Sequence, residues 1–168
     1  MAGAVIAASA AQAAALGLAC MRISRDLFSW DSTAHQRAIT RMDELRAKFL
    51  QWSAKDATAI ARFVELREAG RMLEGQQLLC QAPLTVGQLA VSSAEICQTF
   101  RPHVHERVRD DLEMSISLLS AAARAALLLL DSNLRIWPDP PLQAEFSPAQ
   151  QELAEAIDSL TPKTRILD

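Results

Sequence analysis

The sequence predicts an all-α protein, a bundle of about five helices that forms a single domain over residues 1–168. Half of the residues are hydrophobic, Ala and Leu dominate, only five residues are Gly, and Tyr is absent. Such a composition favours helices over sheets. A chain of 168 residues can bury one substantial core but is too short for two ordinary domains.

The first predicted helix runs from near Ala4 to Ile23 or Asp26. The first 21 residues carry no charged side chain, and because no basic stretch precedes this run we expect no signal peptide. The run is mostly Ala and is poor in the large apolar residues that drive membrane insertion. Small residues such as Gly3 let a second helix approach closely. We therefore interpret this segment as a buried packing helix and expect no membrane partner.

A long second helix is predicted from Ser32 or Thr33, either of which can cap its start, to Glu68. Its apolar residues alternate at spacings of four and three, and Gly70 ends it after about 36 residues, roughly 54 Å. Asp56 occupies one of the apolar positions of this series. Either the apolar stripe widens there and turns Asp56 toward solvent, or the carboxylate lies inside the fold.

Prolines divide the next part of the chain. A short helical piece is expected over 71–81, and Pro83 then opens a third helix that stops before Pro102, because proline excludes its predecessor from the helical basin. The fourth helix, the second of the two long ones, is predicted from near His105 to about Asn133.

The stretch 137–148 contains four prolines and is expected to be irregular, since closely spaced prolines remove backbone donors. Ser147 is a suitable cap and Pro148 a suitable first residue for a fifth helix, which ends before Pro162.

Two charges fall in apolar surroundings on the fourth predicted helix. Asp111 lies on an apolar stripe, although a second stripe runs beside it. Arg124 is the only charged residue between Met114 and Leu130. An unpaired buried guanidinium would be prohibitive, so a buried Arg124 must meet a carboxylate, either Asp56, Asp111 or a ligand's. Alternatively, Arg124 lays its stem over the edge of the bundle and reaches water.

Other classes of function find little support. The net charge is −3 without a cluster of Lys or Arg, so a nucleic-acid partner is not expected. Three widely spaced cysteines without a C-x-x-C motif indicate buried thiols in a reducing compartment, which we interpret as cytoplasmic. His103 and His105 do not share a helical face, so no metal site is expected. Nucleotide-binding, hydrolase and zinc-protease motifs are absent.

Three segments resemble the cyclodeaminase/cyclohydrolase family of folate enzymes. They are the small-residue segment AGAVIAASAAQAAALGLACMRIS, the segment LRAKFLQWSAKDATAIARF with its Asp-Ala pair, and VRDDLEMSISLLSAAARAALLLLDSNLRIWPD. The family typically shows an Asp-Leu, an Arg before a small residue, and an Asn-Leu followed by Asp. The third segment matches these features at Asp111-Leu112, Arg124, Asn133-Leu134 and Asp139.

The resemblance implies a homodimer whose long helices enclose a site for a tetrahydrofolate derivative, with no metal. Members close a formimino group to methenyl with loss of ammonia, or open methenyl to formyl with water. Asp56 or Asp111 would be the general base and would stabilise the cationic one-carbon group. Arg124 would bind the anionic tail of the substrate, and Asn133 and Gly3 would also bind substrate.

Two departures from the family pattern keep a second interpretation open. The chain has Ala2-Gly3-Ala4 where members show a Gly-rich turn, and Leu129-Leu130 where they show Asn-Val. These changes remove flexible or polar groups from the expected pocket. The alternative is a non-catalytic dimeric helical scaffold, or pseudoenzyme, derived from the same family.

Overall fold

The computed structural model describes residues 1–28 and 33–166. Five α-helices account for most of them: α1 (Ala2–Phe28), α2 (Thr33–Glu68), α3 (Met72–Phe100), α4 (Arg109–Ile136) and α5 (Pro140–Ser159). Two short 3₁₀ turns, Arg101–His103 and Glu106–Val108, join α3 to α4. The described ranges contain no β-strand, so the all-α prediction with about five helices is confirmed.

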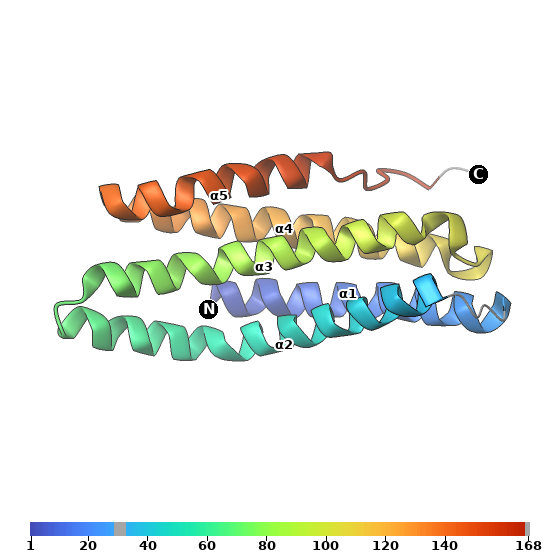
Figure 1. Ribbon diagram of the computed structural model, residues 1–168, viewed down its shortest axis with the longest axis horizontal. Helices are drawn as coiled ribbons and strands as arrows, with labels where there is room; N and C mark the ends of the chain where they lie inside the picture. Colours follow the sequence, from blue (N-terminus) through green and yellow to red (C-terminus); the bar gives the residue numbers. More distant parts are fainter. Residues whose placement is uncertain (29–32, 167–168) are drawn as a thin grey trace.

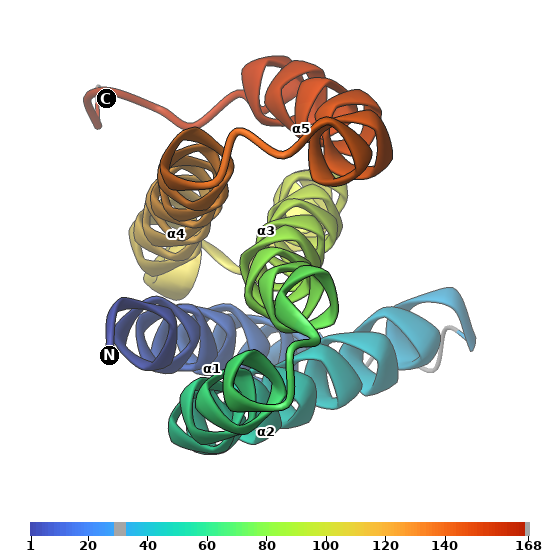
Figure 2. The same ribbon diagram turned by 90° about the vertical axis from the view of Figure 1, so that its left-hand side faces the viewer.

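The helices run side by side in three layers. Seen end-on, α1 and α2 form one layer, α3 and α4 the next, and α5 covers the far side of α3 and α4 (Figure 2). The core between the layers is filled by small side chains of α1 and by larger ones such as Phe49, Ile116 and Leu130, all fully buried. Figure 1 shows that α1 begins part-way along the bundle, so the adjoining ends of α2 and α3 extend beyond it.

The end of α2 agrees with the prediction. Gly70 has a φ of 74°, which favours glycine. The Arg71 N–H donates to the Leu66 carbonyl at 2.8 Å and the Gly70 N–H to the Arg67 carbonyl at 3.1 Å, the pair of bonds that closes a helix in a Schellman motif. Thr33 is the first residue of α2, whereas Ser32, the other predicted cap, lies outside the described residues.

Two predictions based on proline are wrong. The separate piece 71–81 does not exist, because α3 continues through Pro83. The stretch 137–148 is not irregular throughout, because α5 begins at Pro140 and contains Pro148. A proline at the start of a helix occupies a position whose N–H has no intrahelical acceptor, and an interior proline removes a single backbone bond that packing can offset.

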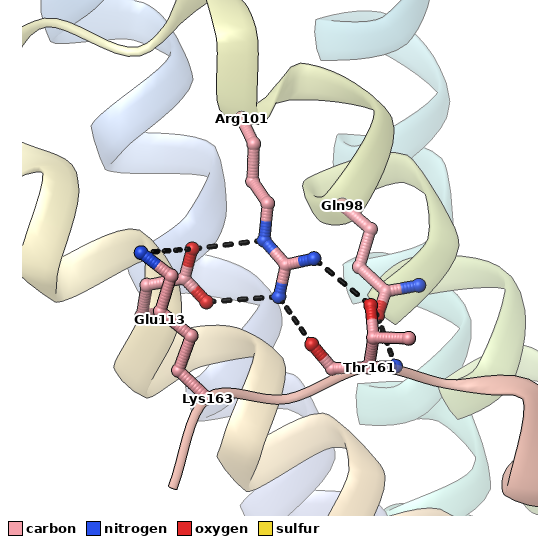
Figure 3. Close-up of polar contacts among 5 residues, drawn as sticks. All are labelled: Gln98, Arg101, Glu113, Thr161 and Lys163. Carbon is pink, nitrogen blue, oxygen red and sulfur yellow. Dashed lines mark hydrogen bonds and ion pairs between the residues drawn. The ribbon is translucent and has the colours of Figure 1, made fainter. Parts of the chain in front are cut away.

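The chain beyond α5 is tied to α3 and α4 by a polar cluster (Figure 3). Glu113 of α4 is 4% exposed and accepts two hydrogen bonds from Arg101, at 2.8 and 2.9 Å. Arg101 also donates to the Thr161 carbonyl at 2.5 Å, and the Thr161 N–H donates to Gln98 at 2.6 Å. This bidentate ion pair therefore joins three parts of the chain.

Two segments, Ala2–Phe28 and Glu106–Ile136, are long and apolar enough to cross a membrane by length and composition alone. Half of the apolar window of each is buried inside the bundle. Core helices of soluble proteins have the same length and composition, so these two properties do not distinguish a membrane-spanning helix from a core helix.

Candidate functional site

Asp56 faces the start of α1. Its side chain is 17% exposed, so the apolar position that it occupies in the α2 pattern does turn toward the bundle. A Cβ built on Gly3 would lie 2.3 Å from Asp56 Oδ1, so glycine at this position leaves room for the Asp56 carboxylate against α1. The Ser53 hydroxyl, one turn before Asp56, donates to the Ala4 carbonyl at 3.1 Å and fixes the same contact.

A small cavity lies beside Asp56 where α1, α2, α3 and α4 meet. Its walls come from Gly3 and Ile6 of α1; Trp52, Lys55, Asp56 and Ala59 of α2; Ala82, Pro83 and Val86 of α3; and Ala126 and Leu129 of α4. The cavity holds about 20 Å³, room for a water molecule but not for a pterin ring. The only acidic group in this lining is the Asp56 carboxylate.

The sequence interpretation missed Lys55 and Trp52 as lining residues. The Lys55 ammonium lies 5.5 Å from the centre of the Trp52 ring, within the range of a cation–π contact. The signal was present in the helical spacing, since Trp52, Lys55, Asp56 and Ala59 fall three or four residues apart on one face. The site therefore offers one carboxylate, one cation and one aromatic ring.

Asp56 is the acidic group of this cavity, and its side chain is only 17% exposed. A carboxylate with little exposure, set among mostly apolar side chains, attracts a positive charge more strongly than one in bulk water. Such a group can stabilise a cationic ligand and can accept a proton from a water molecule or an amine beside it.

Asp111 lies elsewhere. It is half-buried near the first turn of α4, and its charge adds to the effect of burial in raising the pKa of the Cys20 thiol to about 11. Gly3 and Cys20 are both on α1 and 17 residues apart, which is roughly 25 Å along a helix. Within one chain, Asp56 and Asp111 therefore do not share a site.

Of the two interpretations of Arg124, the buried one is wrong. Its side chain is 55% exposed and lies 3.6 Å from the exposed Asp158 of α5. Arg124 lies on the side of α4 next to α5, and its guanidinium reaches water there. The second interpretation, an arginine that reaches solvent at the edge of the bundle, is the one that the structure shows.

Asn133 is half-buried near the end of α4, where its Nδ2 donates to the Leu79 carbonyl of α3 at 2.9 Å. Of the five predicted site residues, the structure therefore brings together only Asp56 and Gly3. In the part of the chain that the structure describes, no group of three or more His, Cys, Asp or Glu side chains could hold a metal ion.

Comparisons with known proteins give a family match and a structural match. The sequence profile described as formiminotransferase-cyclodeaminase matches residues 2–152. Among solved structures, the crystal structure of formiminotetrahydrofolate cyclodeaminase from Thermotoga maritima matches with a TM-score of 0.81 and 17% sequence identity. The match covers 94% of this chain and 81% of that one. A comparison with curated protein sequences finds no match. At this identity the structural likeness shows the fold alone.

Proposed function

This chain belongs to the formiminotransferase-cyclodeaminase family, and on that premise we propose that it is a folate-dependent enzyme of one-carbon chemistry. The reaction is the hydrolysis of a methenyl group or the cyclisation of a formimino group on tetrahydrofolate. The carboxylate of Asp56 is the general base. The observation that supports this assignment is the small cavity beside Asp56, whose carboxylate is only 17% exposed and is the acidic group of the lining.

Both reactions pass through a cationic amidinium that carries the one-carbon unit. A carboxylate in van der Waals contact with that unit lowers the energy of the cation. In hydrolysis a water oxygen bonds to the methenyl carbon while Asp56 accepts one of its protons. The carbon–nitrogen bond then breaks as the new hydroxyl loses its proton to form the formyl group, the leaving nitrogen takes up one proton, and the other proton is released to water. The space of about 20 Å³ beside Asp56 suits the water molecule.

The ring system of the substrate needs more room than this cavity gives. A folate would lie at the mouth of the cavity, where Lys55 and Trp52 are available as a cation and a stacking surface. Asp111 and Arg124 cannot reach the same substrate from within one chain, so a role for either of them requires the second subunit.

Turnover of 5,10-methenyltetrahydrofolate tests the assignment of the base. We expect Asp56→Asn to lower kcat by about 10²–10⁴, the usual contribution of a positioned acid or base, while Asp111→Asn stays within a few-fold of the original chain. Equal activity in the original chain and in Asp56→Asn would show that another group is the base. Circular dichroism of each variant controls for folding.

A homodimer is also part of the proposal, and one face of the bundle suits it. Exposed or half-buried residues on α1 and α4 repeat at alternating spacings of three and four, the pattern of a coiled-coil seam. On α1 they are Ala2, Val5, Ser9, Gln12, Leu16, Ala19 and Ile23, and on α4 Met114, Leu118, Ala121, Ala125, Leu128 and Ser132. Figure 2 shows α1 and α4 side by side along one side of the bundle.

This α1/α4 face has the size and the charge that a second copy needs. Neither row contains a charged residue, so two copies could meet without burying an unpaired charge. Two adjacent helices, each about 10 Å wide and about 27 Å long, present about 500 Å² per copy. The total of about 1,000 Å² is the lower limit for a specific interface. Val5 and Leu128 lie in these rows near the cavity, whose lining includes Gly3 and Leu129.

Light scattering after size-exclusion chromatography tests the dimer. We expect twice the chain mass of 18.4 kDa for the original chain and a monomer for Leu128→Arg, because a buried unpaired guanidinium opposes association. Ile60→Arg, on the exposed side of α2, is the matched control and should stay dimeric. A monomeric original chain, or one that binds lipid vesicles through this face, would overturn the assignment.

The small volume of the cavity favours a second candidate function, a non-catalytic helical scaffold of the same family. A ligand present at 100 times its Kd adds about 2.7 kcal/mol to the stability of the protein that binds it. Thermal melting with tetrahydrofolate derivatives therefore separates the two functions. A shift supports the enzyme, and no shift with any folate would support the scaffold.

A further inference from the structure

Pro83 interrupts the backbone hydrogen bonds of α3 beside the Asp56 cavity. It lies inside the helix and is buried. Proline has no N–H, so the carbonyl of Leu79, four residues earlier, lacks the donor that every other residue type would supply at this position. Pro83 and its neighbour Ala82 are also part of the cavity wall. The backbone of α3 is therefore weakened at the point where it meets the cavity.

A side chain from another helix supplies the missing donor. Asn133 of α4, 54 residues away in sequence, donates its Nδ2 to the Leu79 carbonyl at 2.9 Å. Leu129, one turn before Asn133 on α4, lines the same cavity. This hydrogen bond therefore links α3 to α4, and each of these helices forms a wall of the cavity.

We propose that Asn133 is a positioning residue that completes the hydrogen bonding of α3 at Pro83 and so holds this wall against Asp56. This differs from the substrate-binding role that the family resemblance implies, since the amide donor is used inside the fold. The expected effect of Asn133 on turnover rests on the proposed function. Its expected effect on stability is independent of that function, and the two effects are measured separately.

A double-mutant cycle in the absence of ligand tests the structural part. Asn133→Ala leaves the Leu79 carbonyl without its donor, and we expect a fall of about 2–6 °C in melting temperature. In the Pro83→Ala background residue 83 has an N–H that donates to Leu79 itself, so the same substitution should cost less than half as much. An equal cost in both backgrounds would overturn the proposal.

The matched control is Gln143→Ala. The Gln143 amide donates to the Leu134 carbonyl at 2.7 Å, a bond of the same kind that does not involve Pro83. Its loss should cost the same in the Pro83 and Pro83→Ala backgrounds. Asn133→Asp is the second variant. A carboxylate keeps the size of the side chain but cannot donate and is repelled by the Leu79 carbonyl, so this variant should cost at least as much stability as Asn133→Ala.

Steady-state kinetics with methenyltetrahydrofolate test the positioning role. If Asn133 acts through Pro83, Asn133→Ala lowers kcat in the original background, and adding Pro83→Ala restores at least half of the loss. A substrate-binding Asn133 would instead show a raised KM that Pro83→Ala does not rescue, which would overturn the proposal. If the protein turns over no folate at all, the proposed function fails, while the stability cycle still decides the role of Asn133.

Discussion

Removal of the Arg101 guanidinium should destabilise the protein more than the loss of any surface ion pair. Glu113 is 4% exposed and receives both of its short ion-pair hydrogen bonds from Arg101. In Arg101→Ala the one cation that the described residues still place near the buried carboxylate is Lys163, at 3.9 Å. Breaking a buried pair costs about 3–5 kcal/mol. We expect about 3 kcal/mol, the lower end, because Arg101 is 25% exposed and water can reach the site that it leaves.

Thermal unfolding followed by circular dichroism measures this effect. For a chain of this size 1 kcal/mol shifts the melting temperature by roughly 2–4 °C, so we expect a fall of about 6–12 °C. The control is Arg71→Ala, which removes an exposed pair with Glu74 and should change the stability by less than about 1 kcal/mol. If Arg101→Ala melts within 2 °C of the original chain, the reasoning about the buried Glu113 is wrong.

Packing, burial and the side chains of the described residues, among which no cluster of metal-binding groups is found, each give a further prediction. A Cβ on Gly17 would lie 2.7 Å from both Cys97 Sγ and Ser115 Oγ, so Gly17→Ala should lower the free energy of unfolding, with overpacking of about 1–3 kcal/mol outweighing the gain in helix propensity. Urea titration measures it, and a more stable variant would contradict it. Burial raises the pKa of the three free thiols to about 11–12, so a thiol reagent at pH 8 should label none of them in the folded protein and all three in denaturant. Folate turnover should survive dialysis against a chelator, and its loss, restored by a divalent ion, would show that a metal is needed.

The extent of α2 and the side that it turns toward the bundle could be predicted, because both depend on local features of the sequence. A spacing of four and three over about eight turns and a glycine at its end define this helix, and the same phase places Asp56 toward the bundle. The contact of Asp56 with Gly3 follows from small residues in α1, which the sequence also displays. Helix phase therefore located the residue on which the proposed site depends.

The environment of α4 could not be predicted in the same way, because it depends on contacts between distant segments. Whether Arg124 is buried is decided by where α5 lies against α4, and the structure leaves the guanidinium in water beside Asp158. The continuity of α3 through Pro83 likewise involves Asn133, 54 residues from the carbonyl that it satisfies. No local propensity reports such a pairing.

The central claim is that Asp56 recognises the positive charge of the one-carbon group. The most direct test compares the dissociation constants of two ligands, the cationic methenyl- and the neutral formyl-tetrahydrofolate. Stopped-flow quenching of tryptophan fluorescence measures both constants before the ligand is turned over. A charge-assisted contact of about 1.5–3 kcal/mol predicts that the original chain binds the cation about 10–100 times more tightly, and that Asp56→Asn loses this preference. An equal preference in both proteins would contradict the claim.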